Sequence, residues 1–418
     1  MNSKVASYMP AQDIKNSIIK IPITQLRIGM YVVEIVSGRK SVTVKSEGYV
    51  LNNDAISRLK KSGVTHVSVD PDKDKNKPSQ ELPAVDVSAP EETPPPSAQP
   101  QSKVSLEHEM KTASKLYGNA KELQSRILND IASGKMFDIE SARSQTDAIV
   151  DSIFRNQDAL ACMARLRMKD EYLIEHSLNV SILTTIFAKH LGEKREIIEQ
   201  LALGAFLHDI GKIRIPDEIL HKPGRLTEDE YLQMQRHVQL GLELLEDSAH
   251  LSHVAMSMVR EHHERLDGNG YPLQLVDKQI SKYGRIIAIV DSYDAMTADR
   301  VYKSGIHPIN AFKKLKQSVE SSYDKELVES FIQCLGLYPV GTLVKLDSGK
   351  LGLISQLNTA KPLKPFVKVF YNTRMSQAIP IEEIDLSSSK ARDQIECSIR
   401  PDEFNINLLG FFRTAFID

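Results

Sequence analysis

The stretch LALGAFLHDIGK, from Leu201 to Lys212, decides the fold of the central part of this chain. Its apolar residues follow the spacing of a buried helix, which we expect to run from Ile197 to Ile210. The pair His208-Asp209 stands where this helix ends, so both side chains would be held rigidly. Adjacent side chains project in different directions, so the imidazole can serve one metal ion while the carboxylate bridges to a second.

The 12 histidines of the chain are placed unevenly, and several gather around this stretch. Each of them alone would be an ordinary packed or surface side chain. Their grouping with two aspartates favours a metal site, because mixed imidazole and carboxylate donors suit Zn, Mn or Fe rather than Ca or Mg. Two ions that share such ligands can activate water for attack on a phosphoryl group. The candidate residues are His176, His208, Asp209, His237, His262, His263 and Asp291.

Helical periodicity extends on both sides of this centre, so the fold class is predicted to be mainly α. Apolar residues recur three and four apart in a long pattern from about Ser105 to Lys169. Further helices are expected over Glu228–Leu245, Val254–His263 and Gly284–Met296.

The two ends of the chain have a different character. Strand-length runs at Ile21–Glu34, Ser41–Leu51 and Val64–Val69, with a short helix at Asn53–Lys61, predict a small α/β module. After Tyr338 short alternating runs predict a small β appendix that ends near Phe412. We therefore expect five parts: an α/β N-terminal accessory domain (1–70), a linker rich in proline and charge (71–102), a helical connector (103–169), an all-helical catalytic domain (170–337) and the β appendix (338–418).

Composition excludes several classes of protein. The 418 residues are 41 % hydrophobic and 26 % charged, with a formal net charge of -2, which does not suit binding of long nucleic acid. Cys162, Cys334 and Cys397 lie far apart and predict neither a disulfide framework nor a cysteine zinc site. No apolar run approaches the ~20 residues that span a bilayer, and the N-terminus lacks a signal-peptide core. We expect a cytoplasmic protein without membrane insertion.

Several motifs together resemble the HD-GYP family of metal-dependent phosphodiesterases, within the HD superfamily. They occur in the family's order over about Asp170–Leu337, and each has a recognisable sequence. The matching stretches are HSLNVSILTTIFAKHLG, LGAFLHDIGKIRIPDEILHKPGRLTEDEYLQMQRHVQLG, EHHERLDGNGYP and RIIAIVDSYDAMTADRVYK. The resemblance implies an all-helical HD-type catalytic domain, and it extends to the N-terminal module and the β appendix as common companions of that domain.

The resemblance also implies roles for individual residues. His176, His208, Asp209 and Asp291 resemble the ligands of one metal ion, and Asp209 with His237, His262 and His263 resembles the ligands of the second. Lys212 resembles the lysine that contacts the scissile phosphate, so Asp209 and Lys212 would be the catalytic residues. Arg300 and Lys303 resemble the pair that binds substrate phosphate. Each of these three cations could instead be a plain surface charge.

The GYP motif itself, Gly270-Tyr271-Pro272, is either a simple turn or a loop that borders the site and contacts signalling proteins. Two departures from the family pattern stand out. Members with a third metal carry a carboxylate four residues before the first histidine, where this chain has Tyr172, and so we expect two metals. The usual DRPYR ending reads DRVYK here, so Val301 and Lys303 replace proline and arginine.

The resemblance implies hydrolysis of cyclic di-GMP to linear pGpG, and to GMP if a second cut follows, through a hydroxide that bridges two divalent ions. Fe or Mn is the first choice of metal, with Zn, Ni or Mg as alternatives. A mixed cyclic GMP-AMP substrate, another phosphoester, a non-catalytic cyclic-dinucleotide sensor and a redox di-iron enzyme stay open. The connector helix could pair two chains in a homodimer or pack within one chain.

Overall fold

The fold of the 418-residue chain is that of a computed structural model. The structure describes residues 19–27, 30–37, 48–50, 56, 60, 64–70, 104–165, 172–246, 251–299, 304–319, 321–358 and 360–404. The chain divides into two compact units, Met1–Ser97 and Ala98–Asp418. Among the described residues no helix has the length and hydropathy needed to cross a membrane.

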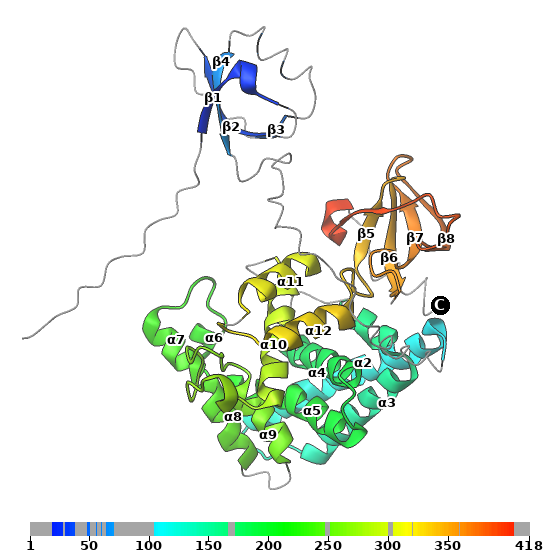
Figure 1. Ribbon diagram of the computed structural model, residues 1–418. Coiled ribbons are helices and arrows are strands. Elements are labelled where there is room, and N and C mark those ends of the chain that lie inside the picture. Colours follow the sequence, from blue (N-terminus) through cyan, green and yellow to red (C-terminus); the bar gives the residue numbers. More distant parts are fainter. Residues whose placement is uncertain are drawn as a thin grey trace, which may run out of the picture. The chain divides into compact units, whose positions relative to one another are not determined.

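The first unit contains a four-stranded antiparallel sheet in the order β1-β4-β2-β3 (Figure 1). Val32, Val67 and Val69 lie in its small apolar core. A 3₁₀ turn, Ile23–Gln25, interrupts the first predicted strand, because Pro22 cannot donate a hydrogen bond to a continuing ladder. The predicted helix at Asn53–Lys61 lies mostly outside the described residues. The strands are β1 Ile19–Pro22, β2 Tyr31–Ser37, β3 Gly48–Tyr49 and β4 Val64–Asp70.

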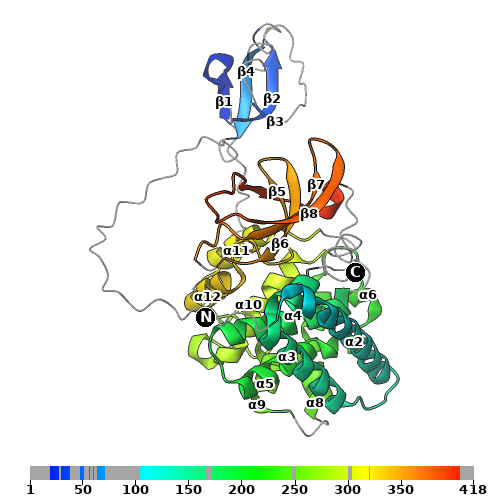
Figure 2. The same cartoon turned by 90° about the vertical axis from the view of Figure 1, so that its right-hand side faces the viewer.

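The second unit is a helical bundle with a five-stranded sheet at one end (Figures 1 and 2). The mainly helical fold class is confirmed. The helices are α2 Leu106–Ala132, α3 Ile139–Met163, α4 Tyr172–His190, α5 Arg195–Leu207, α6 Asp217–Leu220, α7 Glu228–Gln235, α8 His237–Glu246, α9 His253–Glu261, α10 Lys282–Thr297, α11 Pro308–Gln317 and α12 Lys325–Leu335.

One predicted helix is wrong in detail, because Glu228–Leu245 forms two helices that break at Arg236. The break has a local cause. The His237 ring bonds at Nδ1 with the Met234 carbonyl at 2.6 Å, and the Arg236 N–H bonds to the Gln233 carbonyl in a tighter turn. The imidazole therefore bonds with a carbonyl that would accept a backbone N–H in a continuous helix.

The core of the bundle surrounds α4 and α5. Both helices are apolar on most sides, and α5 buries eight residues from Ile198 to Leu207. Helices α2 and α3 pack against each other and against this pair, so the predicted connector packs within the chain. A helix that is hydrophobic nearly all round must lie in the interior. The end of α5, with His208 and Asp209, is consequently held deep in the molecule.

The C-terminal sheet is antiparallel in the order β8-β7-β6-β5-β9 and confirms the predicted β appendix. It lies beside α11 and α12, at the opposite end of the bundle from α8 and α9 (Figures 1 and 2). Val344, Leu353 and Val367 join the core of the bundle. The strands are β5 Leu343–Leu346, β6 Lys350–Gln356, β7 Phe366–Asn372, β8 Gln377–Asp385 and β9 Ile395–Ser398.

Candidate metal centre

The structure brings all seven predicted histidines and aspartates into one buried cluster, which we call the His/Asp cluster. Five elements supply it. His176 lies in the first turns of α4, His208 follows the last residue of α5, and Asp209 stands between α5 and the 3₁₀ turn Ile210–Arg214. The remaining members are His237 at the start of α8, His262 and His263 at the end of α9, and Asp291 on α10.

Asp209 lies at the middle of the cluster and faces two groups of imidazoles. Its Oδ2 atom lies 3.6 Å from His176 Nε2 and 3.3 Å from His208 Nε2. Its Oδ1 atom lies on the other side, 3.4 Å from His237 Nε2 and 3.8 Å from His262 Nε2. The potential ligand atoms of each group lie within 4.8 Å of one another, and His263 completes the second group.

Asp291 also faces both groups. Its Oδ1 atom is 3.0 Å from His176 Nε2 and 4.0 Å from His208 Nε2, while its Oδ2 atom is 3.8 Å from His263 Nδ1. The sequence assigned Asp291 to the first group alone. The structure adds a contact with the second, between Asp291 Oδ2 and His263 Nδ1.

Backbone carbonyls fix the orientation of three of the rings. His208, His237 and His262 each bond at Nδ1 with the carbonyl three residues earlier, at 2.7, 2.6 and 2.8 Å. A ring that donates from Nδ1 in its neutral form presents an Nε2 lone pair. Each helix end therefore presents an acceptor nitrogen to the carboxylate of Asp209.

Burial keeps most of these rings neutral. Desolvation lowers the pKa of His237 to about 4, although the Asp209 carboxylate opposes the shift. Desolvation also holds the pKa values of His262 and His263 well below their usual range. Burial alone would raise the pKa of Asp209, but His208 and Lys212 outweigh it and hold that pKa well below normal. The cluster thus combines an ionised Asp209 with three neutral imidazoles, those of His237, His262 and His263.

The residues fit divalent cations. His208 Nε2 and Asp209 Oδ1 are buried and have no hydrogen-bond partner among the described residues. Moreover, His237 Nε2 lies 3.2 Å from His262 Nε2, although both rings use their Nδ1 atoms to bond with carbonyls. Acceptors that face acceptors in a buried site repel one another unless a cation lies between them. Imidazole and carboxylate together suit Fe, Mn, Zn or Ni.

His176 is oriented by a residue that the sequence did not single out. Its Nδ1 atom lies 2.7 Å from Asp294 Oδ2, and Asp294 is completely buried. Burial would lower the pKa of His176, but hydrogen bonds with Asp291 and Asp294 raise it to about 9. One sequence signal could have indicated Asp294, because it lies three residues after Asp291 and so on the same face of α10.

Comparisons with known proteins show the family of this chain. Residues 161–327 match the HD domain family, and residues 18–142 match a domain of unknown function, DUF3391. The chain is 35 % identical to the cyclic di-GMP phosphodiesterase PA4108 of Pseudomonas aeruginosa, over 90 % of this chain and 91 % of that protein. With its HD pair and GYP loop, the chain belongs to the HD-GYP family. It is a hydrolase.

Two further relatives match the HD-GYP domain over a shorter length. The cyclic di-GMP phosphodiesterase response regulator RpfG of Xanthomonas campestris is 39 % identical over 36 % of this chain and 40 % of its own. The 3'3'-cGAMP-specific phosphodiesterase 1 of Vibrio cholerae is 42 % identical over 33 % of this chain and 32 % of its own.

The GYP loop of this HD-GYP protein contacts the cluster. The Tyr271 ring lies 4.5 Å from the His263 ring, and the Tyr271 N–H bonds to the His263 carbonyl at 3.2 Å. The buried carboxylate of Glu264 accepts bonds from Leu273 N and Leu275 N at 2.7 and 2.9 Å. A Cβ atom on Gly270 would lie 2.4 Å from Arg265 N, so only glycine permits this approach.

The structure describes one of the three predicted phosphate-binding cations, Lys212. Lys212 Nζ lies 2.6 Å from Asp209 Oδ2, with 19 % of its side chain exposed. Arg300 and Lys303 lie outside the described residues. Glu175, three residues after Tyr172, is buried, and its carboxylate accepts a bond from Lys121 Nζ at 2.8 Å. It is therefore directed to α2.

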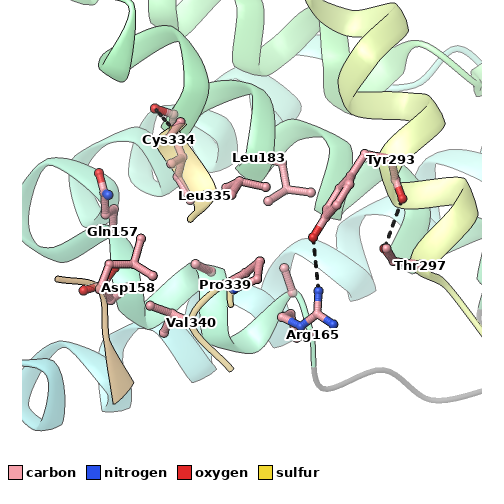
Figure 3. A pocket seen from close by; sticks show the side chains of 14 residues that line it. Gln157, Asp158, Arg165, Leu183, Tyr293, Thr297, Cys334, Leu335, Pro339 and Val340 are labelled. Carbon is pink, nitrogen blue, oxygen red and sulfur yellow. Dashed lines mark hydrogen bonds between the residues drawn. The ribbon is translucent and has the colours of Figure 1, made fainter. Parts of the chain in front are cut away.

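A small, partly open cavity lies elsewhere, among α3, α4, α10, α12 and the chain leading to β5 (Figure 3). Leu183, Leu335 and Val340 form part of its apolar lining, and the Arg165 guanidinium donates to the Tyr293 hydroxyl at 3.4 Å. No member of the His/Asp cluster lines it. The chemistry of the side chains, and not the size of a cavity, therefore identifies the candidate site.

Proposed function

We propose that this protein hydrolyses cyclic di-GMP to linear pGpG, and to GMP if a second cut follows. One observation carries the proposal. A single carboxylate, Asp209, directs one oxygen to each of two groups of imidazoles. The relative that matches 90 % of the chain bears the name of a cyclic di-GMP phosphodiesterase, which supports this substrate.

The proposed ligands follow the two groups. His176, His208, Asp209 and Asp291 would hold one divalent ion, and Asp209 with His237, His262 and His263 would hold the other, with Fe or Mn as first choice. Such ions would supply Lewis-acid chemistry, which makes water a stronger nucleophile and neutralises phosphoryl charge. Asp209 would serve both positions.

The cationic side chains would position the phosphodiester. Lys212 lies at the partly exposed edge of the cluster, and its ammonium group can turn from Asp209 to a scissile phosphate oxygen. Arg300 can bind phosphate through two parallel hydrogen bonds and Lys303 through its point charge. Tyr271 would limit access of water on the side of His263.

A mixed cyclic GMP-AMP is the second candidate substrate. The observation that favours it is the 42 % identity with the 3'3'-cGAMP-specific enzyme of Vibrio cholerae over a third of the chain. Both substrates contain the same phosphodiester, so the cluster would act on either. A sensor that binds a cyclic dinucleotide without cutting it is the remaining alternative.

The division into five parts, the cytoplasmic location, and contacts of the GYP loop with signalling proteins belong to the same proposal. So does pairing of two chains in a homodimer.

The test is hydrolysis by the purified full-length protein of cyclic di-GMP and of the mixed dinucleotide, with Mn²⁺ or Fe²⁺ supplied anaerobically. We expect cyclic di-GMP to be cut faster, and a His208→Ala plus Asp209→Ala variant to be inactive with less bound metal. Faster cutting of the mixed dinucleotide would change the assigned substrate. Binding of either compound without any cutting would favour the sensor.

A further inference from the structure

Two polar contacts join α2 to α4 on either side of a proposed metal ligand. Lys121 Nζ forms an ion pair with Glu175 Oε1 at 2.8 Å, and the Tyr117 hydroxyl donates to Asn179 Oδ1 at 3.0 Å. Glu175 is 2 % exposed and Asn179 is fully buried. His176 follows Glu175 directly, so the two contacts lie in the same turns of α4 as the first imidazole of the cluster.

The spacing of the contacts allows them to restrain the position of α4. Tyr117 and Lys121 are four residues apart on α2, and so are Glu175 and Asn179 on α4, so each pair lies on one helix face. Two contacts a turn apart resist both rotation of α4 about its axis and sliding along it. Either motion would shift His176 away from Asp209, which is 3.6 Å from its Nε2 atom.

Helix α2 belongs to one segment by sequence match and to another by packing. The DUF3391 match covers residues 18–142 and therefore includes all of α2 with the N-terminal module. In the structure α2 nevertheless belongs to the second unit and packs against α3 and α4. A segment associated with the N-terminal domain thus contributes side chains beside the catalytic cluster.

We propose that Tyr117 and Lys121 are positioning residues for His176. They hold α4 in the register that forms the first group of the cluster, and they do so from the element that follows the N-terminal module. This inference rests on the proposed function, since it takes His176 as a metal ligand. It adds a role for α2 that the cluster alone does not require.

The experiment compares variants of the full-length protein. Lys121→Met removes the ion pair, and Tyr117→Phe removes only one hydroxyl, so at least the second variant should fold. Lys121→Arg keeps the charge and should restore binding. The matched control is Arg155→Met, which removes the bonds of 2.9 and 2.8 Å from Arg155 to Glu109, between the same α2 and the neighbouring α3.

Mn²⁺ affinity is measured by calorimetry, with melting temperature and turnover measured in parallel. We expect Lys121→Met and Tyr117→Phe to weaken one of two Mn²⁺ sites by about 10- to 100-fold. Their kcat should fall at low Mn²⁺ and recover at saturating Mn²⁺, with KM little changed. Arg155→Met should lower the melting temperature while Mn²⁺ affinity stays within about twofold.

The outcomes separate this inference from the proposed function. A wild-type protein that binds no Mn²⁺ and cuts no dinucleotide would overturn the proposed function, and this inference with it. A second outcome would overturn the positioning role alone. In it the wild-type protein binds Mn²⁺ and cuts a dinucleotide, and the Tyr117→Phe plus Lys121→Met variant binds Mn²⁺ with unchanged affinity. Equal weakening of Mn²⁺ binding by Arg155→Met would show that the effect comes from a general loss of stability. That outcome would also overturn the positioning role.

Discussion

The Nδ1 contacts of His208, His237 and His262 show why the sequence predicted the cluster residues so fully. Each histidine follows a helical turn, and the carbonyl three residues earlier lies within reach of the ring. The orientation of such a ring is therefore decided locally. Asp294 is different, because its role depends on which side of α10 faces α4. The spacing of three residues from Asp291 indicates a shared helix face, but the contact with His176 is tertiary information.

Asp294→Asn should weaken metal binding although Asp294 is not a proposed ligand. The amide loses the negative charge that holds the His176 ring at 2.7 Å, and such supporting carboxylates typically contribute 10- to 100-fold in affinity. Calorimetric titration with Mn²⁺ measures the effect. Asp277→Asn, which changes an exposed pair with Arg285, is the control and should bind normally. Equal affinities in the two variants would contradict the role of Asp294.

Asp158→Asn should stabilise the protein at neutral pH. Asp158 lines the cavity of Figure 3, and desolvation raises its pKa from 3.8 to about 6 although Lys189 opposes the shift. The folded state therefore binds more protons than the unfolded state between those pH values, and the wild type loses stability as pH rises through them. At about 1.4 kcal/mol per pKa unit, the cost at neutral pH is on the order of 3 kcal/mol.

Urea unfolding of both proteins at pH 7.5 and pH 5 measures this difference. The advantage of Asp158→Asn should be largest at pH 7.5 and should shrink as the pH falls below about 6, where the wild-type carboxyl group becomes protonated. An advantage that is independent of pH would show that folding does not shift the pKa of Asp158.

At the scale of elements, the 3₁₀ turn Ile210–Arg214 and α8 meet through two glycines. A Cβ atom on Gly211 would lie 2.0 Å from the His237 carbonyl and 2.4 Å from Gly241 N. This contact sets the distance between the α5 end and the start of α8, and so between Asp209 and His237. The sequence indicated the two histidine-bearing segments but not their close approach, which depends on tertiary packing.

Gly211→Ala should therefore destabilise the fold and displace His237. Overpacking of this kind typically costs about 1–3 kcal/mol, and the displaced ring should also lower Mn²⁺ affinity. The control is Gly118→Ala, in the middle of α2, where a Cβ atom meets nothing within 4 Å. That change should stabilise the protein by about 0.5–1 kcal/mol. Urea unfolding and calorimetry distinguish the two variants, and normal Mn²⁺ binding by Gly211→Ala would contradict the argument.

Predicted and observed elements differ where a side chain competes with the backbone. The predicted helix Glu228–Leu245 ends at Gln235, beside the Nδ1 contact of His237. Similarly, α3 contains one residue with non-helical dihedral angles, Asn156, whose side chain donates to the Val104 carbonyl. Apolar spacing predicts which residues are helical, but it does not register such local competition.

For the whole molecule, the cluster joins segments that are far apart in the chain. Because the metal ions would bind the folded state and not the separated ligands of the unfolded chain, Mn²⁺ should raise the melting temperature. At 100 times the dissociation constant the stabilisation is about 2.7 kcal/mol. Thermal unfolding with and without chelator measures it. The His208→Ala plus Asp209→Ala variant should not respond, and an equal response would place the bound metal elsewhere.

The helical class and the β appendix were predictable from apolar periodicity, since both follow from local patterns. The packing of α2 beside α4 was not, because a proline-rich segment separates the connector from the N-terminal module in the sequence. Composition placed a boundary near residue 102, and the contacts divide the chain at Ser97. The contribution of α2 to the surroundings of His176 is visible only in three dimensions.

Helices α5 and α9 both end at the cluster, where His208 and His262 are their C-terminal caps. The carboxyl end of a helix carries a partial negative charge. The backbone therefore adds negative charge beside Asp209 and Asp291, and before cations bind these charges would disfavour the approach of a phosphodiester. We expect an obligatory loading order: cations enter first, and the anionic dinucleotide follows only when the sign of the potential has been reversed.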